Sequence, residues 1–156
     1  MIQKAFFFDL DGTLAENDNP ASKEDINAIR SLRLKGHKVF LCTGRAPCHI
    51  YKEILDIGFD GIVSGAGAYI TIGDKVIFKR EIEPNQLNRI ISAFLDNHKF
   101  CILEGVQNLY IINPISDVKW LKHWPQLHNA DAFTSGKGKY EGQSVLKFTV
   151  RGERNG

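Results

Sequence analysis

Residues 5–13 read Ala-Phe-Phe-Phe-Asp-Leu-Asp-Gly-Thr, a short apolar run that ends abruptly at two carboxylates. An uninterrupted apolar run of this length is typical of a strand that is buried on both faces of a parallel sheet. Asp9 and Asp11 are separated by one residue just beyond this strand, and Gly12 permits a tight turn there. We therefore expect both carboxylates to face the same crevice at the carboxyl end of the strand.

Strand and helix patterns alternate along the next fifty residues or so. Ser22 and Asp25 resemble a capping box, which marks the start of a helix. The predicted elements are, in order, a helix from Ser22 to Gly36, a buried strand over 39–42, a helix from Pro47 to near Gly58, and a short strand over 61–64. This β-α-β-α-β order indicates an open parallel sheet wound by helices, an α/β fold.

The pattern changes after the third strand. Residues 69–72 and 76–78 flank Gly73-Asp74-Lys75 and predict a hairpin. The elements predicted beyond it are a helix from Pro84 to about His98, a strand pair over 100–104 and 109–112, a short helix over 115–124, a polar Gly-rich stretch over 129–143, and a last strand over 145–150. Antiparallel strands after parallel winding predict a second, α+β lobe, and we place the domains at residues 1–79 and 80–156.

Composition excludes several classes of function. The 20 basic and 18 acidic residues nearly cancel, so nothing indicates binding to nucleic acid or to an anionic membrane surface. No apolar run approaches the roughly 20 residues that span a bilayer, and the first residues lack the features of a signal peptide. The three cysteines show no C-x-x-C spacing, which is typical of reduced thiols in a cytoplasmic protein.

A second polar signal, Thr43-Gly44-Arg45, follows the second predicted strand. Carboxyl ends of neighbouring parallel strands form the edge at which open α/β sheets bind ligands. The Thr43 hydroxyl, the Gly44 N–H and the Arg45 fork would all suit phosphate oxygens. Asp9 could then attack phosphorus, and Asp11 could act as general acid and base. Two carboxylates beside a phosphate call for a hard cation, and Mg²⁺ fits best.

These two motifs resemble those of the haloacid dehalogenase superfamily. Asp-x-Asp-Gly-Thr after an apolar strand is similar to its first motif, and Thr-Gly-Arg at the end of the next strand is similar to its second. Their spacing, and residues 64–70 followed by a hairpin, resemble the Cof-like branch, in which a large cap is inserted after the third strand. The resemblance implies a Rossmann-like core, represented here by three parallel strands, and part of an α+β cap.

The resemblance also implies roles for individual residues. Asp9 would be the nucleophile and Asp11 the acid and base. The Asp9 carboxylate and the Asp11 backbone carbonyl would hold Mg²⁺, and Thr43 would bind the phosphoryl group, with Gly44 and Arg45 as further phosphate contacts. The implied substrates are small phosphorylated metabolites, most commonly sugar phosphates. Ala66 departs from the pattern, because many relatives have asparagine there.

Other departures concern the rest of the family's site. The family's lysine and its acidic pair have no visible counterpart, since the acidic residues after residue 120 are only Asp131, Glu141 and Glu153. We therefore expect this sequence to hold the amino-terminal part of such a protein, with the later core strands missing. Phe6–Phe8 would then lie on an open sheet edge, which predicts self-association or a partner that completes the sheet.

Three readings of function follow. The first is a Mg²⁺-dependent phosphatase that acts through an aspartyl-phosphate, and the second is a catalytically inactive fragment or a self-associating binding scaffold. The third, a phospho-accepting receiver domain, is disfavoured because receivers carry the acceptor on a later strand. Purely structural interpretations remain for single residues. Asp9 and Asp11 could be loop caps, and Thr43 and Arg45 could form a turn and a surface salt bridge. Glu104 and Asn108 are weaker candidates to face the site.

Overall fold

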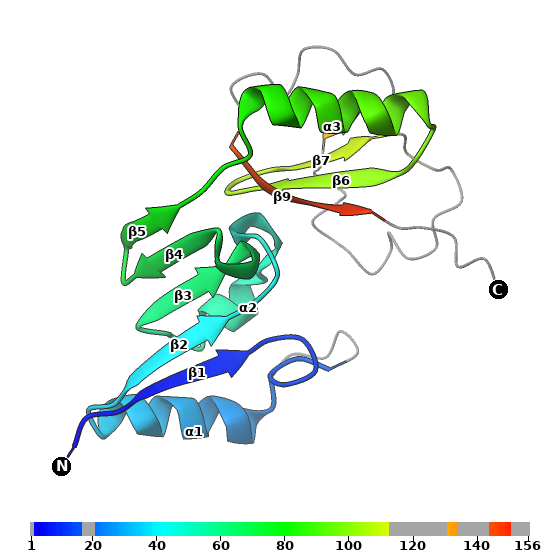
Figure 1. Ribbon diagram of the computed structural model, residues 1–156. Helices are drawn as coiled ribbons and strands as arrows, with labels where there is room; N and C mark the ends of the chain where they lie inside the picture. The colour runs from blue at the N-terminus through cyan, green and yellow to red at the C-terminus, as the bar shows by residue number, and fades with distance from the viewer. Residues whose placement is uncertain (1, 17–20, 113–130, 134–143, 151–156) are drawn as a thin grey trace. The chain divides into compact units, whose positions relative to one another are not determined.

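Two separate β-sheets organise the chain (Figure 1). The computed structural model describes residues 2–16, 21–112, 131–133 and 144–150. The chain divides into two compact units, Met1–Arg80 and Glu81–Gly156, and each has a sheet and a hydrophobic core of its own.

The first unit is built on a five-stranded sheet with the order β1-β2-β3-β4-β5. Its strands are β1 (Ala5–Asp9), β2 (Lys38–Cys42), β3 (Gly61–Ser64), β4 (Tyr69–Ile72) and β5 (Lys75–Lys79). The first three strands run parallel, and the last two form the predicted antiparallel hairpin. The predicted α/β core with three parallel strands is therefore confirmed.

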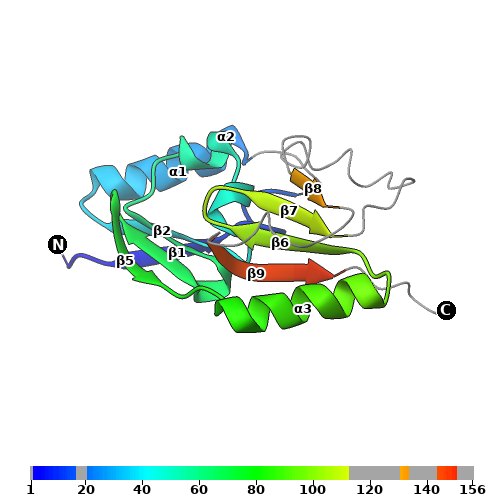
Figure 2. The ribbon, with the colours of Figure 1, turned by 90° about the horizontal axis from the view of Figure 1, so that it is seen from above.

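Both helices of this unit lie on the same face of the sheet (Figure 2). They are α1 (Lys23–Leu34) and the short α2 (Lys52–Leu55). Right-handed crossovers between strands laid down in one direction place successive helices on one face. Ile29 of α1 and Ile54 of α2 pack into one core with Val39 and Leu41 of β2. This core fixes the positions of the strand ends that carry the polar motifs.

The expectation that the first strand is buried on both faces is wrong. Phe7 is 62% exposed, because β1 is the edge strand of the described sheet and α1 and α2 cover only one of its faces. The ring of Phe7 stacks on Phe40 of β2, with centroids 4.8 Å apart. The position of β1 at the edge of the described sheet agrees with the prediction that Phe6–Phe8 lie on an open sheet edge.

The predicted second helix is also shorter than expected. A 3₁₀ turn, η1 (Pro47–His49), is followed by extended backbone at Ile50 and Tyr51 before α2 begins. Extended ψ angles at these two residues, 122° and 145°, interrupt the helical hydrogen bonding. The interruption turns Tyr51 away from a helical register, and this matters for the site described below.

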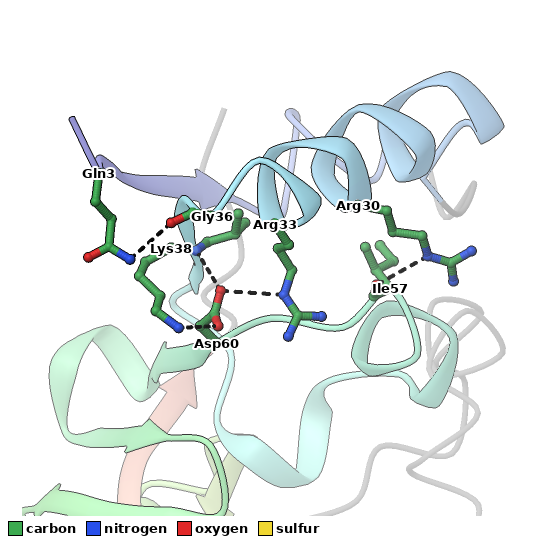
Figure 3. Close-up of polar contacts among 8 residues, drawn as sticks. Gln3, Arg30, Arg33, Gly36, Lys38, Ile57 and Asp60 are labelled. Carbon is green, nitrogen blue, oxygen red and sulfur yellow. Dashed lines mark hydrogen bonds and ion pairs between the residues drawn. The ribbon is translucent and has the colours of Figure 1, made fainter. Parts of the chain in front are cut away.

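A carboxylate junction ties α1 to the sheet (Figure 3). The Asp60 carboxylate, just before β3, accepts a 2.9 Å hydrogen bond from the backbone N–H of Val39 and pairs with Lys38 at 3.1 Å and Arg33 at 3.4 Å. Burial acts to raise the pKa of Asp60, but the Val39 hydrogen bond and the two cations outweigh it and hold the pKa below its ordinary value of 3.8. The ionised carboxylate therefore stabilises the folded unit.

This junction predicts a pH-dependent stability. Because the folded state holds the pKa of Asp60 low, its contribution is present above the ordinary pKa of 3.8 and is lost as pH falls through the lowered value. Asp60→Asn should cost about 1–2 kcal/mol at neutral pH. In urea unfolding, the difference between the two proteins should shrink steadily from about pH 5 to about pH 2. A difference that is the same at every pH would contradict the ionic role of Asp60.

The second unit carries a four-stranded sheet with the order β8-β7-β6-β9. Its strands are β6 (Cys101–Gly105), β7 (Leu109–Ile112), β8 (Asp131–Phe133) and β9 (Val145–Val150), and its helix is α3 (Pro84–Asp96). Leu87 and Ile91 of α3 pack against Leu103 and Tyr110 on one face of this sheet. β8 corrects the sequence prediction, which placed no strand between 129 and 143. The helix predicted over 115–124 lies outside the described residues.

Glu104 is the one buried acidic side chain among the described residues, and it lies on β6 of the second unit. Its carboxylate accepts a 2.6 Å hydrogen bond from the Thr149 hydroxyl and lies 3.3 Å from the Lys147 ammonium. Burial, with the nearby Glu104 charge, raises the pKa of the Cys101 thiol to about 12. Cys42, Cys48 and Cys101 are present as thiols, of which Cys101 is buried and the other two are half-buried. None of the helices that the structure describes is long and apolar enough to span a bilayer.

Candidate active site

The two polar motifs meet at one edge of the first unit's sheet. In the parallel pairing of β1 with β2, Asp9 stands opposite Cys42, so Thr43 is the next residue beyond that pair. Asp9 is exposed at the last position of β1. Across the described residues, its carboxylate makes no hydrogen bond or ion pair. The structure thus presents an uncommitted carboxylate at the carboxyl end of the edge strand.

The chain turns sharply after Asp9 and is anchored by Leu10. The Leu10 side chain is fully buried, and its carbonyl accepts hydrogen bonds from the N–H groups of Leu14 and Ala15 at 3.0 and 2.8 Å. Gly12, at a φ of +81°, closes this loop by donating to the Ala15 carbonyl at 2.8 Å. A left-handed residue is needed at this position, and glycine adopts it without strain. The loop holds Asp11 at the surface beside Asp9.

Asp11 is joined to Arg45 by a two-pronged ion pair. The Nη2 and Nε atoms of Arg45 lie 2.6 and 3.2 Å from Oδ1 of Asp11, and Nε also lies 3.1 Å from Oδ2. The Asp11 side chain is 54% exposed, whereas that of Arg45 is only 17% exposed. The structure therefore brings Asp11 and Arg45 together in a salt bridge. A salt bridge was the purely structural interpretation of Arg45 in the sequence analysis.

Arg45 is held from its other sides as well. Its guanidinium carbon lies 4.8 Å from the centre of the Tyr51 ring, and its Nη1 lies 3.5 Å from the carbonyl oxygen of His49. Burial alone would lower the pKa of Arg45, but hydrogen bonds to Asp11 and to the Tyr51 side chain raise it above its ordinary value. The guanidinium is thus a fixed, permanently charged group at the edge of the site.

Thr43 is buried, and its backbone joins β2 to the turn after β3. Its N–H donates to the Val63 carbonyl at 2.8 Å, and its carbonyl accepts from the N–H of Ala66 at 3.2 Å. Its hydroxyl accepts a 3.1 Å hydrogen bond from the Arg45 N–H. Gly44 between them is exposed, and a Cβ there would meet nothing within 4 Å. The motif is therefore rigid in its backbone and open at Gly44.

The turn that holds this motif contains a strained residue. Ala66, in the 3₁₀ turn η2 (Gly65–Gly67), has a φ of +55° and a ψ of +38°, in the left-handed region that few residues other than glycine and asparagine occupy. Its flanking residue Gly65 donates a 2.6 Å hydrogen bond to the Arg45 carbonyl. Asparagine adopts this conformation more readily than alanine does.

The oxygen donors at this edge are few. Across the described residues, no three His, Cys, Asp or Glu side chains lie close enough together to hold a metal ion. Mg²⁺ commonly binds through one or two carboxylates while keeping several waters and contacting substrate phosphate. The exposed and uncommitted Asp9 carboxylate fits that kind of donor set, with the Asp11 backbone as a neighbouring donor.

Sequence reasoning missed Tyr51 and the carbonyl of His49. Both lie in the segment that was expected to be one continuous helix, so no pattern in the sequence singled them out. The aromatic ring six positions after Arg45 is the only signal in this segment, because an arginine guanidinium can lie over the face of an aromatic ring.

Comparison with known proteins now adds to this geometry. A family model described as haloacid dehalogenase-like hydrolase matches residues 6–155. The putative phosphatase YkrA of Bacillus subtilis (strain 168) is 28% identical over 91 residues, which cover 58% of this chain and 35% of that protein. The chain thus spans about a third of the length of this curated relative.

Solved structures match nearly the whole chain. The haloacid dehalogenase (HAD) subclass IIB sugar phosphatase BT4131 is 24% identical, with a TM-score of 0.73 over 96% of this chain and 58% of that one. A haloacid dehalogenase-like hydrolase from B. subtilis is 18% identical, with a TM-score of 0.74 over 97% of this chain and 62% of that one. At these identities the likeness concerns the fold, and it confirms the predicted fold class.

Proposed function

Because the chain belongs to the haloacid dehalogenase-like hydrolase family, we propose that Asp9, Asp11, Thr43 and Arg45 form the phosphoryl-transfer site of a Mg²⁺-dependent phosphatase. The observation that carries the proposal is the Asp9 carboxylate. It is exposed at the end of β1, has no hydrogen-bond partner among the described residues, and lies opposite Cys42, the residue before Thr43. A nucleophile needs this combination of access and a neighbouring phosphate cradle.

The proposed reaction has two steps. A carboxylate oxygen of Asp9 attacks phosphorus and the bond to the ester oxygen breaks, while Asp11 gives that oxygen a proton. A water molecule then attacks the aspartyl-phosphate and gives its proton to Asp11, so that Asp9 and orthophosphate are released. Gly44 and Thr43 would bind the phosphate oxygens. A Mg²⁺ ion held by Asp9 and the Asp11 backbone would neutralise phosphate charge.

The roles of the two units and the substrate class are part of the same proposal. We propose that residues 80–156 are part of an α+β cap and residues 1–79 part of the core, since α3 and a second, mixed sheet follow directly after the β4–β5 hairpin. A small phosphorylated metabolite, with sugar phosphates first, is the substrate class to test. Of the two weaker candidates in the second unit, Glu104 is buried and paired with Thr149 and Lys147, whereas Asn108 is exposed. A cytoplasmic location stays a prediction from the sequence.

The test is hydrolysis of a generic aryl phosphate by the full chain, with Mg²⁺ and with a chelator. Release of orthophosphate that depends on Mg²⁺ would support the phosphatase. Complete inactivity under both conditions, in a protein shown to be folded, would favour the second reading, a binding scaffold without catalysis.

Self-association is the partner interaction that we propose. The edge strand β1 exposes Phe7, and the face of the sheet opposite α1 and α2 carries Phe7, Phe40, Val63, Ile70 and Ile72 by register. An apolar edge strand is a template for pairing with another chain, and a second copy offers a matching edge. We propose that two copies pair through β1.

This pairing predicts a dimer by light scattering at high protein concentration. Phe7→Lys places a charge on the exposed edge and should give the monomer mass. Leu34→Lys is the matched control, because Leu34 is a 90% exposed apolar residue that ends α1 and is not part of β1. It should remain dimeric. A wild-type chain that is strictly monomeric would overturn the proposal.

A further inference from the structure

The Arg45 guanidinium, which is proposed to bind the phosphate group, is already paired with the Asp11 carboxylate. Both oxygens of the Asp11 carboxylate accept hydrogen bonds from Arg45, at distances between 2.6 and 3.2 Å. A guanidinium matches a carboxylate and a phosphate with the same two-pronged geometry. The Asp11 carboxylate thus occupies the position that a phosphate group would take on Arg45.

The two partners differ in how firmly they are held. Arg45 is 17% exposed, stacks on Tyr51 at 4.8 Å and contacts the His49 carbonyl, whereas Asp11 is 54% exposed on a loop. Within the described residues, Asp11 has no other side-chain partner. An exchange at this fork would therefore move the Asp11 side chain and leave Arg45 in place.

We propose that Arg45 is an exchange site, at which the Asp11 carboxylate holds the place of the substrate's phosphate until substrate arrives, with Tyr51 as the residue that positions Arg45. The inference rests on the proposed phosphatase function and deepens it. It predicts an order of events, because phosphate can occupy the fork only after Asp11 has left it.

The exchange has a chemical consequence. While both oxygens of Asp11 accept hydrogen bonds from Arg45, the carboxylate is held in its ionised form and carries no proton for a leaving group. Phosphate on Arg45 releases the Asp11 carboxylate beside the reacting centre, where it can take up the proton of the substrate's phosphate monoanion and pass it to the leaving ester oxygen. Binding of the correct group thus switches on the acid, and a ligand without phosphate leaves Asp11 engaged.

Calorimetric titration of the full chain with orthophosphate tests the exchange without requiring turnover. Asp11→Asn removes the competing carboxylate while keeping its shape at an exposed position, and it should tighten phosphate binding on the order of tenfold. Relief of charge repulsion alone would also tighten binding, so the same change is made in an Arg45→Lys background. Lysine keeps the charge but has no fork. There the tightening should fall to about threefold or less.

Tyr51 provides a second test. Tyr51→Leu removes the ring and should weaken orthophosphate binding by about threefold to tenfold, whereas Tyr51→Phe keeps the ring and should restore most of the affinity. A purely structural role for the ring would change thermal unfolding without this pattern in phosphate affinity. Equal affinity in all three proteins would show that Tyr51 does not position Arg45.

The outcomes separate the exchange from the function on which it rests. If neither the wild type nor Asp11→Asn binds orthophosphate at any accessible concentration, the phosphoryl site itself is wrong and the exchange falls with it. If phosphate binds and Asp11→Asn tightens it equally with Arg45 and with Arg45→Lys, the exchange is overturned and the phosphate site stands. Tightening that requires Arg45 is the result expected.

Discussion

Asp9→Asn is expected to abolish Mg²⁺-dependent hydrolysis of an aryl phosphate, with a loss of at least about 10³-fold. The amide has the same shape as the carboxylate, so the loop anchored by Leu10 should be unchanged. It is a poor nucleophile and a poor ligand for Mg²⁺, and both proposed roles of Asp9 are removed together. Orthophosphate release by wild type and variant, measured over a range of Mg²⁺ concentrations, gives the comparison.

The matched control is Asp25→Asn. Asp25 lies in the first turn of α1, where its backbone N–H is capped by the Ser22 hydroxyl at 3.0 Å, and it belongs to no part of the proposed site. The same change of charge there should leave hydrolysis within about twofold of the wild type. A variant at Asp9 that keeps wild-type turnover would exclude Asp9 as the nucleophile.

Gly61→Ala should destabilise the first unit by about 3 kcal/mol or more. Gly61 begins β3 between β2 and β4, and a Cβ there would lie 2.4 Å from the Thr71 carbonyl oxygen and 2.9 Å from the Phe40 ring. The carbonyl belongs to the backbone of the neighbouring strand, so the clash is relieved only by moving β3 away from β4. Urea unfolding, followed by amide hydrogen exchange of β2 and β3, measures the loss within this unit.

Gly44→Ala is the glycine control for stability. Gly44 lacks a positive φ, and a Cβ there would meet nothing within 4 Å, so the free energy of unfolding should change by less than about 0.5 kcal/mol. If Gly61→Ala is equally well tolerated, the pairing of β3 with β4 in register at Gly61 and Ile72 is wrong.

The order of elements followed from local sequence patterns. Ser22 caps α1 through Asp25, as the capping box predicts, and the turn at Gly73-Asp74 joins β4 to β5. These features depend on residues close in sequence, which is why the sequence predicts them. The placement of Asp9, Thr43, Gly44 and Arg45 at one edge of the sheet was likewise predictable, since the carboxyl ends of parallel strands meet at one edge.

Features that depend on long-range contacts were not predictable in the same way. The three phenylalanines of β1 look like a doubly buried strand, but their exposure is set by what pairs with β1, and Phe7 is 62% exposed. The break at Ile50 and Tyr51 places an aromatic ring under Arg45, a contact that no helical period indicates. β8 is three residues long in a polar stretch, too short for an alternating pattern to stand out.

The Asp11–Arg45 pair is compatible with both a structural and a functional interpretation of the same two residues. A salt bridge was the plain alternative for Arg45, and the structure contains it. Because a carboxylate and a phosphate compete for one guanidinium fork, the salt bridge also marks where phosphate is proposed to bind.

The central claim is that Asp9 accepts a phosphoryl group. The measurement that tests it most directly is mass spectrometry of the chain after brief incubation with an aryl phosphate and Mg²⁺ and an acid quench, with the modified peptide sequenced. The account predicts a phosphoryl group on Asp9 in the wild type and none in Asp9→Asn. Phosphate on another residue, or turnover that leaves Asp9 unmodified at every quench time, would contradict it.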